Sequence, residues 1–207
     1  THTLEEKFDR NEGIGFTTKA SAIDLTDELK LAGSLEAGAD STLELQVTGS
    51  DSGSIRITDN KVTLAAENTY GKLVVDDKAE AVLDKKQTLT QGGLISGKVS
   101  GKGGLDVTGG TLTVSETGSS NVAIRLDAED ETAGAELAFV NRKGNPVIYA
   151  GDVSAVSGAR VSFADTTGDF SLASGTADYV LSGTSAVTFG PYADESALKD
   201  TFTLQDA

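Results

Sequence analysis

The segment closest in pattern to a reaction centre is GSDSGS, residues 49–54. Within it Ser52 stands in an Asp-Ser-Gly-Ser tetrapeptide, a setting in which serine nucleophiles occur. A serine nucleophile of this kind needs a histidine base, and the only histidine of the chain is His2, close to its start. We therefore interpret GSDSGS as a turn between two strands and reject a protease within this chain.

Two other segments are candidate cation sites. Gly101 to Asp106 (GKGGLD) is similar to one unit of the nonapeptide calcium repeats, which bind ions only in tandem, and it occurs once. The carboxylates of Asp127, Glu129, Asp130 and Glu131 are the hard ligands that calcium prefers, but their spacing is irregular and no glycine marks the turn of an EF-hand loop. The sequence predicts a strand corner and a solvated acidic loop, with no metal.

Carbohydrate and phosphate chemistry make further demands on the sequence. Glycosidases need two carboxylates in a groove, and with 32 acidic residues such pairs arise by chance. Tryptophan, the usual platform for a sugar ring, is absent, and the tyrosines are Tyr70, Tyr149, Tyr179 and Tyr192. Neither Gly97-Lys98 nor Gly101-Lys102 has the spacing of a phosphate-binding loop. We expect no enzyme, no catalytic residue and no cofactor, and keep a polysaccharide-acting enzyme as an alternative.

The bulk composition limits the remaining classes. The 207 residues carry 32 acidic and 17 basic side chains, for a net charge of −15. Such a surface repels phosphate backbones and anionic lipids, so we expect no nucleic-acid partner. The chain has no cysteine, which excludes disulfides, thiol catalysis and zinc sites built on thiolates.

Short apolar groups that alternate with polar residues fill the chain from Thr42 onward, and each group predicts one short strand. Glycine, serine, asparagine and aspartate lie between the groups and supply corners. The groups include Leu43/Leu45/Val47, Ile55/Ile57, Val62/Leu64, Leu73/Val75, Val82/Leu83, Leu94/Ile95, Leu105/Val107, Leu112/Val114, Val122/Ile124/Leu126, Leu137/Phe139, Val147/Tyr149, Val161/Phe163, Phe170/Leu172, Tyr179/Leu181, Val187/Phe189 and Phe202/Leu204.

The spacing of these groups fits two all-β architectures. Phe163, Leu172, Leu181 and Phe189 follow at intervals of 9, 9 and 8 residues, so three strands make a coil of roughly 25 residues. An antiparallel β-sandwich and a right-handed parallel β-helix both contain such strands. The tiny corners, the lack of Asn-Gly and Asp-Gly turns and the low aromatic content favour the β-helix, with roughly eight coils.

The first part of the chain has a different texture. Residues 1–41 are predicted to form an N-terminal cap or lead-in segment, with one or two helical turns around Leu4 to Asp9. Residues 42–207 are predicted to form the β-helix body. Because the sequence begins at Thr1, we expect a processed product or a piece of a longer protein.

Two phrases of the chain resemble the autotransporter-associated β-strand repeats of bacterial type V autotransporter passengers. They are KVTLAAENTYGKLVV at residues 61–75 and TLTQGGLISGKVSGKGGLDVTGGTLTV at residues 88–114. The chain departs from the family pattern where Gly71 follows Tyr70 directly and where Asp106 replaces a lysine or threonine. The sharp part of the likeness covers about a quarter of the chain, so what it implies concerns fold more than activity.

The resemblance implies a secreted or surface-displayed passenger of a Gram-negative bacterium, built as a rigid β-helix. Such a passenger acts as a stalk or adhesin, and its expected partners are a host receptor, the extracellular matrix or a neighbouring bacterial surface. Self-association is also expected, and membrane contact only through a barrel domain outside this sequence. A filament or surface-layer subunit, built as a sandwich, is the other non-enzymatic hypothesis.

Overall fold

The computed structural model describes most of the middle of the chain and separate strands toward both ends. All regular structure in this part of the chain is β-strand. The described residues are 2–3, 17–18, 23–25, 27–33, 41–43, 47–49, 53–115, 121–128, 134–141, 151–156, 158–165, 179–181 and 186–189.

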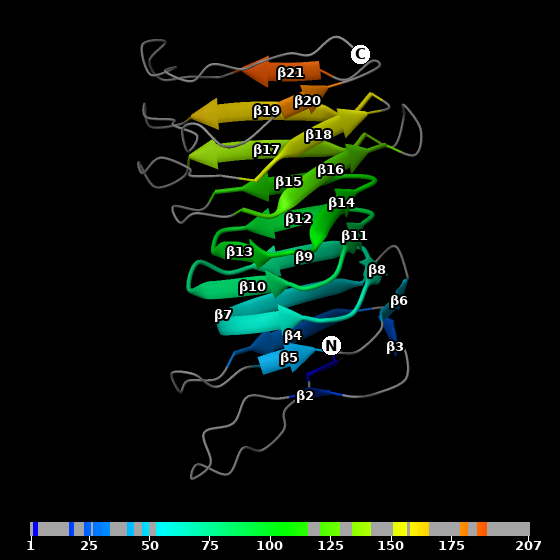
Figure 1. Ribbon diagram of the computed structural model, residues 1–207, viewed down its shortest axis with the longest axis vertical. Coiled ribbons are helices and arrows are strands. Elements are labelled where there is room, and N and C mark those ends of the chain that lie inside the picture. Colours follow the sequence, from blue (N-terminus) through cyan, green and yellow to red (C-terminus); the bar gives the residue numbers. More distant parts are fainter. Residues whose placement is uncertain are drawn as a thin grey trace.

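The strands stack in three columns, which we call the first, second and third faces (Figure 1). The first face contains β1 (His2–Thr3), β4 (Glu28–Ala32), the start of β7 (Ser54–Leu64), β9 (Lys72–Val75), β12 (Gly92–Ile95), β15 (Thr111–Val114), β17 (Glu136–Asn141), β19 (Arg160–Asp165) and β21 (Ala186–Phe189). The second face contains β2 (Thr17–Thr18), β5 (Ser41–Leu43), the end of β7, β10 (Ala79–Leu83) and β13 (Lys98–Gly101). The third face contains the pair β3 (Ile23–Leu25) and β6 (Val47–Gly49), then β8 (Asn68–Tyr70), β11 (Gln87–Leu89), β14 (Gly104–Val107), β16 (Ala123–Asp127), β18 (Val153–Val156) and β20 (Tyr179–Leu181).

Every strand pair among the described residues is parallel. The chain runs along one face, turns to the next, and returns one layer higher, which is the path of a parallel β-solenoid. The all-β parallel prediction is confirmed. The antiparallel sandwich is ruled out, and the filament hypothesis loses the fold on which it was built.

The number of residues per coil differs from the expected 25. Along one inward-facing row of the first face, consecutive partners are Leu29, Ile55, Leu73, Gly93, Leu112, Leu137, Val161 and Val187. From Ile55 to Leu112 a layer takes 18 to 20 residues, whereas outside that stretch it takes 24 to 26. The short coils, residues 53–115, are called the central coils. Their corners hold only one to three residues, which is why they fall below the expectation.

Nine strands follow one another along the first face, close to the eight coils expected. Two predicted groups merge in β7, which serves two faces and bends at Asn60 (φ 54°). The prediction of a single strand from a third group is wrong, because Leu43 belongs to β5 on the second face and Val47 to β6 on the third. A change of face interrupts that alternation.

Residues 1–41 contain four of the described strands. β4 lies in register with β7, β2 with β5 and β3 with β6, so these strands continue the layers of the body. The helical turns expected around Leu4 to Asp9 lie outside the described residues.

The core is one continuous column of inward side chains, mostly leucine, isoleucine, valine and alanine. Alternation along each strand produces it, because every second residue points to the inside. A polar step interrupts the column where Asn68 and Gln87 stack, with the Gln87 amide donating to the carbonyl oxygens of Ala66 (2.8 Å), Lys85 (3.1 Å) and Lys86 (3.0 Å). These bonds stabilise the corner between the second and third faces from the inside.

Candidate binding surface

The segment that carries the candidate serine nucleophile joins β6 to β7. Gly49 ends β6 and Ser54 begins β7, while Ser52 itself lies outside the described residues. His2 opens β1, a strand of two residues that pairs with β4. The interpretation of GSDSGS as a turn between strands agrees with this placement of its two ends.

Gly101 to Asp106 forms a corner of the coil and the start of the next strand. Gly101 ends β13 with φ of 118°, and a Cβ there would lie 2.3 Å from the carbonyl oxygen of Leu83. Asp106 lies in β14, where a carboxylate oxygen is 3.6 Å from Nζ of Lys86. The glycines therefore serve close packing of layers, as the corner interpretation requires.

Asp127 is the only described member of the acidic group, because Glu129 to Glu131 lie outside the described residues. It ends β16 and accepts a hydrogen bond from the guanidinium of Arg125. Across the described ranges, no three His, Cys, Asp or Glu side chains come together as a metal site.

Tyr70 is not available as a platform for a sugar ring, because its side chain is fully buried in the core. Its hydroxyl has no hydrogen-bond partner among the described residues, and burial raises the pKa of the phenol well above its usual range. Tyr149 and Tyr192 lie outside the described residues, and Tyr179 begins β20.

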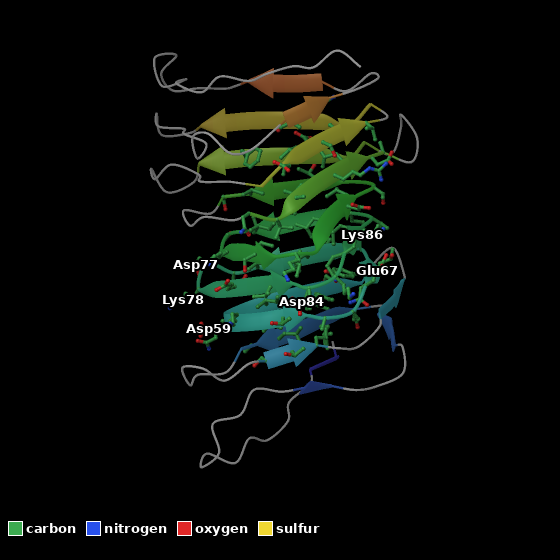
Figure 2. All side chains as sticks on the ribbon, viewed as in Figure 1. Asp59, Glu67, Asp77, Lys78, Asp84 and Lys86 are labelled. Atoms are coloured by element: carbon green, nitrogen blue, oxygen red, sulfur yellow. The ribbon has the colours of Figure 1, made fainter. Side chains whose placement is uncertain are left out.

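Charged side chains on the outside connect one layer to the next. Nζ of Lys86 lies 3.4 Å from Glu67 in the layer before and 3.6 Å from Asp106 in the layer after. Figure 2 shows Glu67 and Lys86 at one corner of the coils, and Asp59, Asp77 and Lys78 at the opposite corner. Each such pair is partly exposed and contributes about 0–1 kcal/mol at most.

Two further ionic contacts follow the same pattern. Nε of Arg56 donates to Asp76 at 3.0 Å, and this hydrogen bond raises the pKa of the guanidinium above its ordinary value. Glu80 accepts from the hydroxyl of Ser100 at 2.8 Å and lies 3.3 Å from Lys98. Both contacts join adjacent layers, so they fix the register between them.

Charge is divided unevenly along the chain. The central coils, residues 53–115, hold seven acidic and eight basic side chains, whereas the rest of the chain holds 25 acidic and nine basic ones. The net charge is therefore +1 in the central coils and −16 outside them. An anionic ligand that is repelled by the whole chain meets a locally neutral surface there.

A hollow lies on the outer side of the first face, across β9, β12 and β15, with a volume of about 400 Å³. Its origin is Gly92 and Gly93, whose φ angles of 77° and 147° belong to backbone that L side chains rarely adopt. Gly92 lies beside Thr111, and Gly93 lies between Leu73 and Leu112. We call this feature the glycine hollow, and its lining is Lys72, Val74, Gln91, Gly93, Leu94 and Thr111.

Sequence reasoning assigned no binding residue and missed the hollow. A signal was present, since Gly93 occupies a position that is leucine in the layers before and after it. By composition the glycine pair predicts only a corner, although here it forms the start of a strand.

The fold assigns the protein to the parallel β-solenoids. No protein family, no curated protein and no solved structure matches the chain. Within the described residues, no helix combines the length and apolarity needed to cross a membrane.

Proposed function

We propose that the chain is a non-enzymatic section of a secreted or surface-displayed passenger of the bacterial autotransporter kind. It acts as a rigid stalk whose outer faces attach to a host receptor, to extracellular matrix or to a neighbouring bacterial cell. Contact with a second copy of the same chain belongs to this proposal. The site of action is the cell surface or the space outside it.

The observation that carries the proposal is the unbroken parallel stacking along the first face. Nine layers at about 4.8 Å each give a stack on the order of 43 Å for this section alone. Each layer buries its neighbour's apolar side chains, so stiffness and stability accumulate along the axis. A shape of this kind holds attachment points at a fixed distance and needs no reaction centre.

The stacking also supports a role in folding of a longer passenger. Energetics in such a stack are dominated by neighbouring layers, so a formed coil is a template for the next one. The central coils are the natural start, because their corners hold only one to three residues and cost little loop-closure entropy.

Attachment of coated beads tests the proposal. Fluorescent beads carrying the full chain are applied to epithelial cells, to matrix-coated wells and to Gram-negative cells, with heat-denatured chain at equal density as the control. Binding several-fold above the control to at least one surface is expected, and clumping of the beads reports self-association. Equal binding of native and denatured beads to all surfaces, without clumping, would reject an adhesive role.

A further inference from the structure

The glycine hollow is a built depression in an otherwise regular sheet. A Cβ added at Gly93 would lie 2.0 Å from the carbonyl oxygen of Leu73, and one at Gly92 would lie 2.2 Å from that of Thr111. No side chain larger than hydrogen fits either place without moving the backbone of a neighbouring layer. The two glycines thus leave an opening of about 400 Å³, within the range of small-molecule sites.

The lining of the hollow combines an apolar floor with a polar rim. Val74 and Leu94 are outward residues of β9 and β12 that lie side by side, and both are half-buried. Gln91 supplies an amide and Thr111 a hydroxyl at the starts of β12 and β15. A ring with C–H groups on its face and hydroxyls on its edge matches this lining, because each part meets a surface of its own kind.

Lys72 sets the expected charge of the ligand. It is the only charged residue of the lining, it is exposed, and it makes no ion pair with any described residue. The surrounding central coils have a net charge of +1, so a carboxylate is not repelled locally. One ammonium group is too little for a phosphate, which is usually held by several donors.

We infer that the glycine hollow binds one carboxylated hexose unit of a glycan, of the hexuronic acid type. The ring lies on Val74 and Leu94, its hydroxyls hydrogen-bond to Gln91 and Thr111, and its carboxylate pairs with Lys72. This inference names a ligand for the surface of the stalk and so rests on the proposed adhesive function for its biological role.

Amide chemical-shift titration of the full chain with sodium glucuronate tests the inference, with glucose and acetate as separate arms. Glucuronate is expected to shift the amides of residues 72–74, 91–94 and 111, with a Kd on the order of millimolar for a ligand of this size. Glucose is expected to bind about threefold more weakly, because a single exposed ion pair is lost. Acetate is expected to leave residues 91–94 unshifted, because it has no ring.

Two pairs of variants separate the parts of the site, with far-ultraviolet circular dichroism as the check on folding. Lys72→Gln is expected to remove the preference for glucuronate over glucose, while Lys78→Gln, at a corner away from the hollow, leaves it unchanged. Leu94→Glu is expected to weaken binding more than tenfold, while Thr113→Glu, the next outward residue of the same row, changes it less than twofold.

The absence of shifts in the folded wild-type chain at about 50 mM glucuronate, well above the expected millimolar Kd, would overturn the inference, as would equal binding of acetate. Equal loss in Leu94→Glu and Thr113→Glu would do the same. The bead assay on cells is read separately, so a stalk that attaches without binding glucuronate leaves the proposed function standing and rejects the hollow as its site.

Discussion

Between Ile55 and Leu112 the first face advances one layer for every 18 to 20 residues, whereas beyond Leu112 each layer takes 24 to 26. Both regions keep the same inward rows and the same parallel register. The difference lies in the residues between strands, since a central corner holds one to three residues. Coil length in this fold is set by the corners, while the strands stay about the same.

The two regions also divide the chain's charge. The net charge of +1 in residues 53–115 stands against −16 in the rest of the sequence. Acidic side chains keep a large β-surface soluble, and the long segments between strands are where they can be placed without interrupting a row. The central coils keep several of their few charges in pairs that join layers, such as Arg56 with Asp76.

The largest effect is expected from truncating a core leucine in each region. Leu73→Ala and Leu137→Ala both remove a fully buried side chain, and each should cost about 2–5 kcal/mol of unfolding free energy. Because layers depend on their neighbours, we expect Leu73→Ala to speed hydrogen exchange in the central coils and beyond, and Leu137→Ala only in β15 to β19. Identical exchange patterns in the two variants would show that the regions unfold as one unit.

Glycine corners should separate the regions next. In Gly101→Ala the new Cβ meets the backbone of Leu83 at a φ of 118°, so we expect a loss of about 3 kcal/mol. Gly134, in a longer coil, has φ of 58° and nothing within 4 Å of the position a Cβ would take, so Gly134→Ala should cost only about 1 kcal/mol. Urea unfolding measures both. Equal costs would mean that the central corners are no tighter than the others.

A smaller change is expected from Tyr70→Phe, which removes a buried hydroxyl that lacks a partner among the described residues. The variant should be more stable than wild type by about 1 kcal/mol at pH 7. Burial raises the pKa of the folded phenol, while the unfolded one titrates near its usual value of about 10. The folded chain therefore keeps a proton that the unfolded chain loses, and wild-type stability falls as pH rises above about 10.

Urea midpoints at about pH 7, 9 and 10.5, on both sides of the unfolded phenol's pKa, check this prediction. Tyr70→Phe should lose less stability than wild type over the upper interval, because one group with a raised pKa is gone. A variant that is weaker at neutral pH would indicate that the Tyr70 hydroxyl has a partner in solution.

The smallest effect is expected from surface charge. Lys86→Met should lose about 0.5 kcal/mol, because the lysine is 47% exposed and contacts Glu67 and Asp106 across layers. The loss should disappear in about 1 M salt. In Arg125→Met the broken pair with Asp127 lies within one strand, so no measurable loss is expected. A larger loss for Arg125→Met would reverse the assignment of layer-joining pairs to the central coils.

The parallel stack could be predicted because each layer repeats the same short alternation. Ile55/Ile57, Leu73/Val75 and Leu112/Val114 are inward positions of adjacent or nearby layers, as their alternation indicates. The coil length could not, because an average over the whole chain conceals two populations of corners. The bend of β7 at Asn60 was equally hidden, since only a backbone angle marks it.

The hollow was beyond sequence reasoning for a different reason. Gly92 and Gly93 predict a turn by composition, and only the register with Leu73 and Leu112 shows that Gly93 stands where its neighbours have an inward side chain. Val74 and Leu94 are 20 residues apart, and their pairing depends on the length of the coil between them. A site assembled from separate layers becomes visible once that length is known.

The stacking of layers has a mechanical consequence. When the chain is pulled from its two ends, load falls on the contacts between layers, and coils can peel off one at a time. A central coil would release about 19 residues, or about 65 Å of extended chain, and a longer coil about 25 residues, or about 85 Å. A force–extension trace would then carry two spacings of rupture peaks, a direct imprint of the two corner lengths.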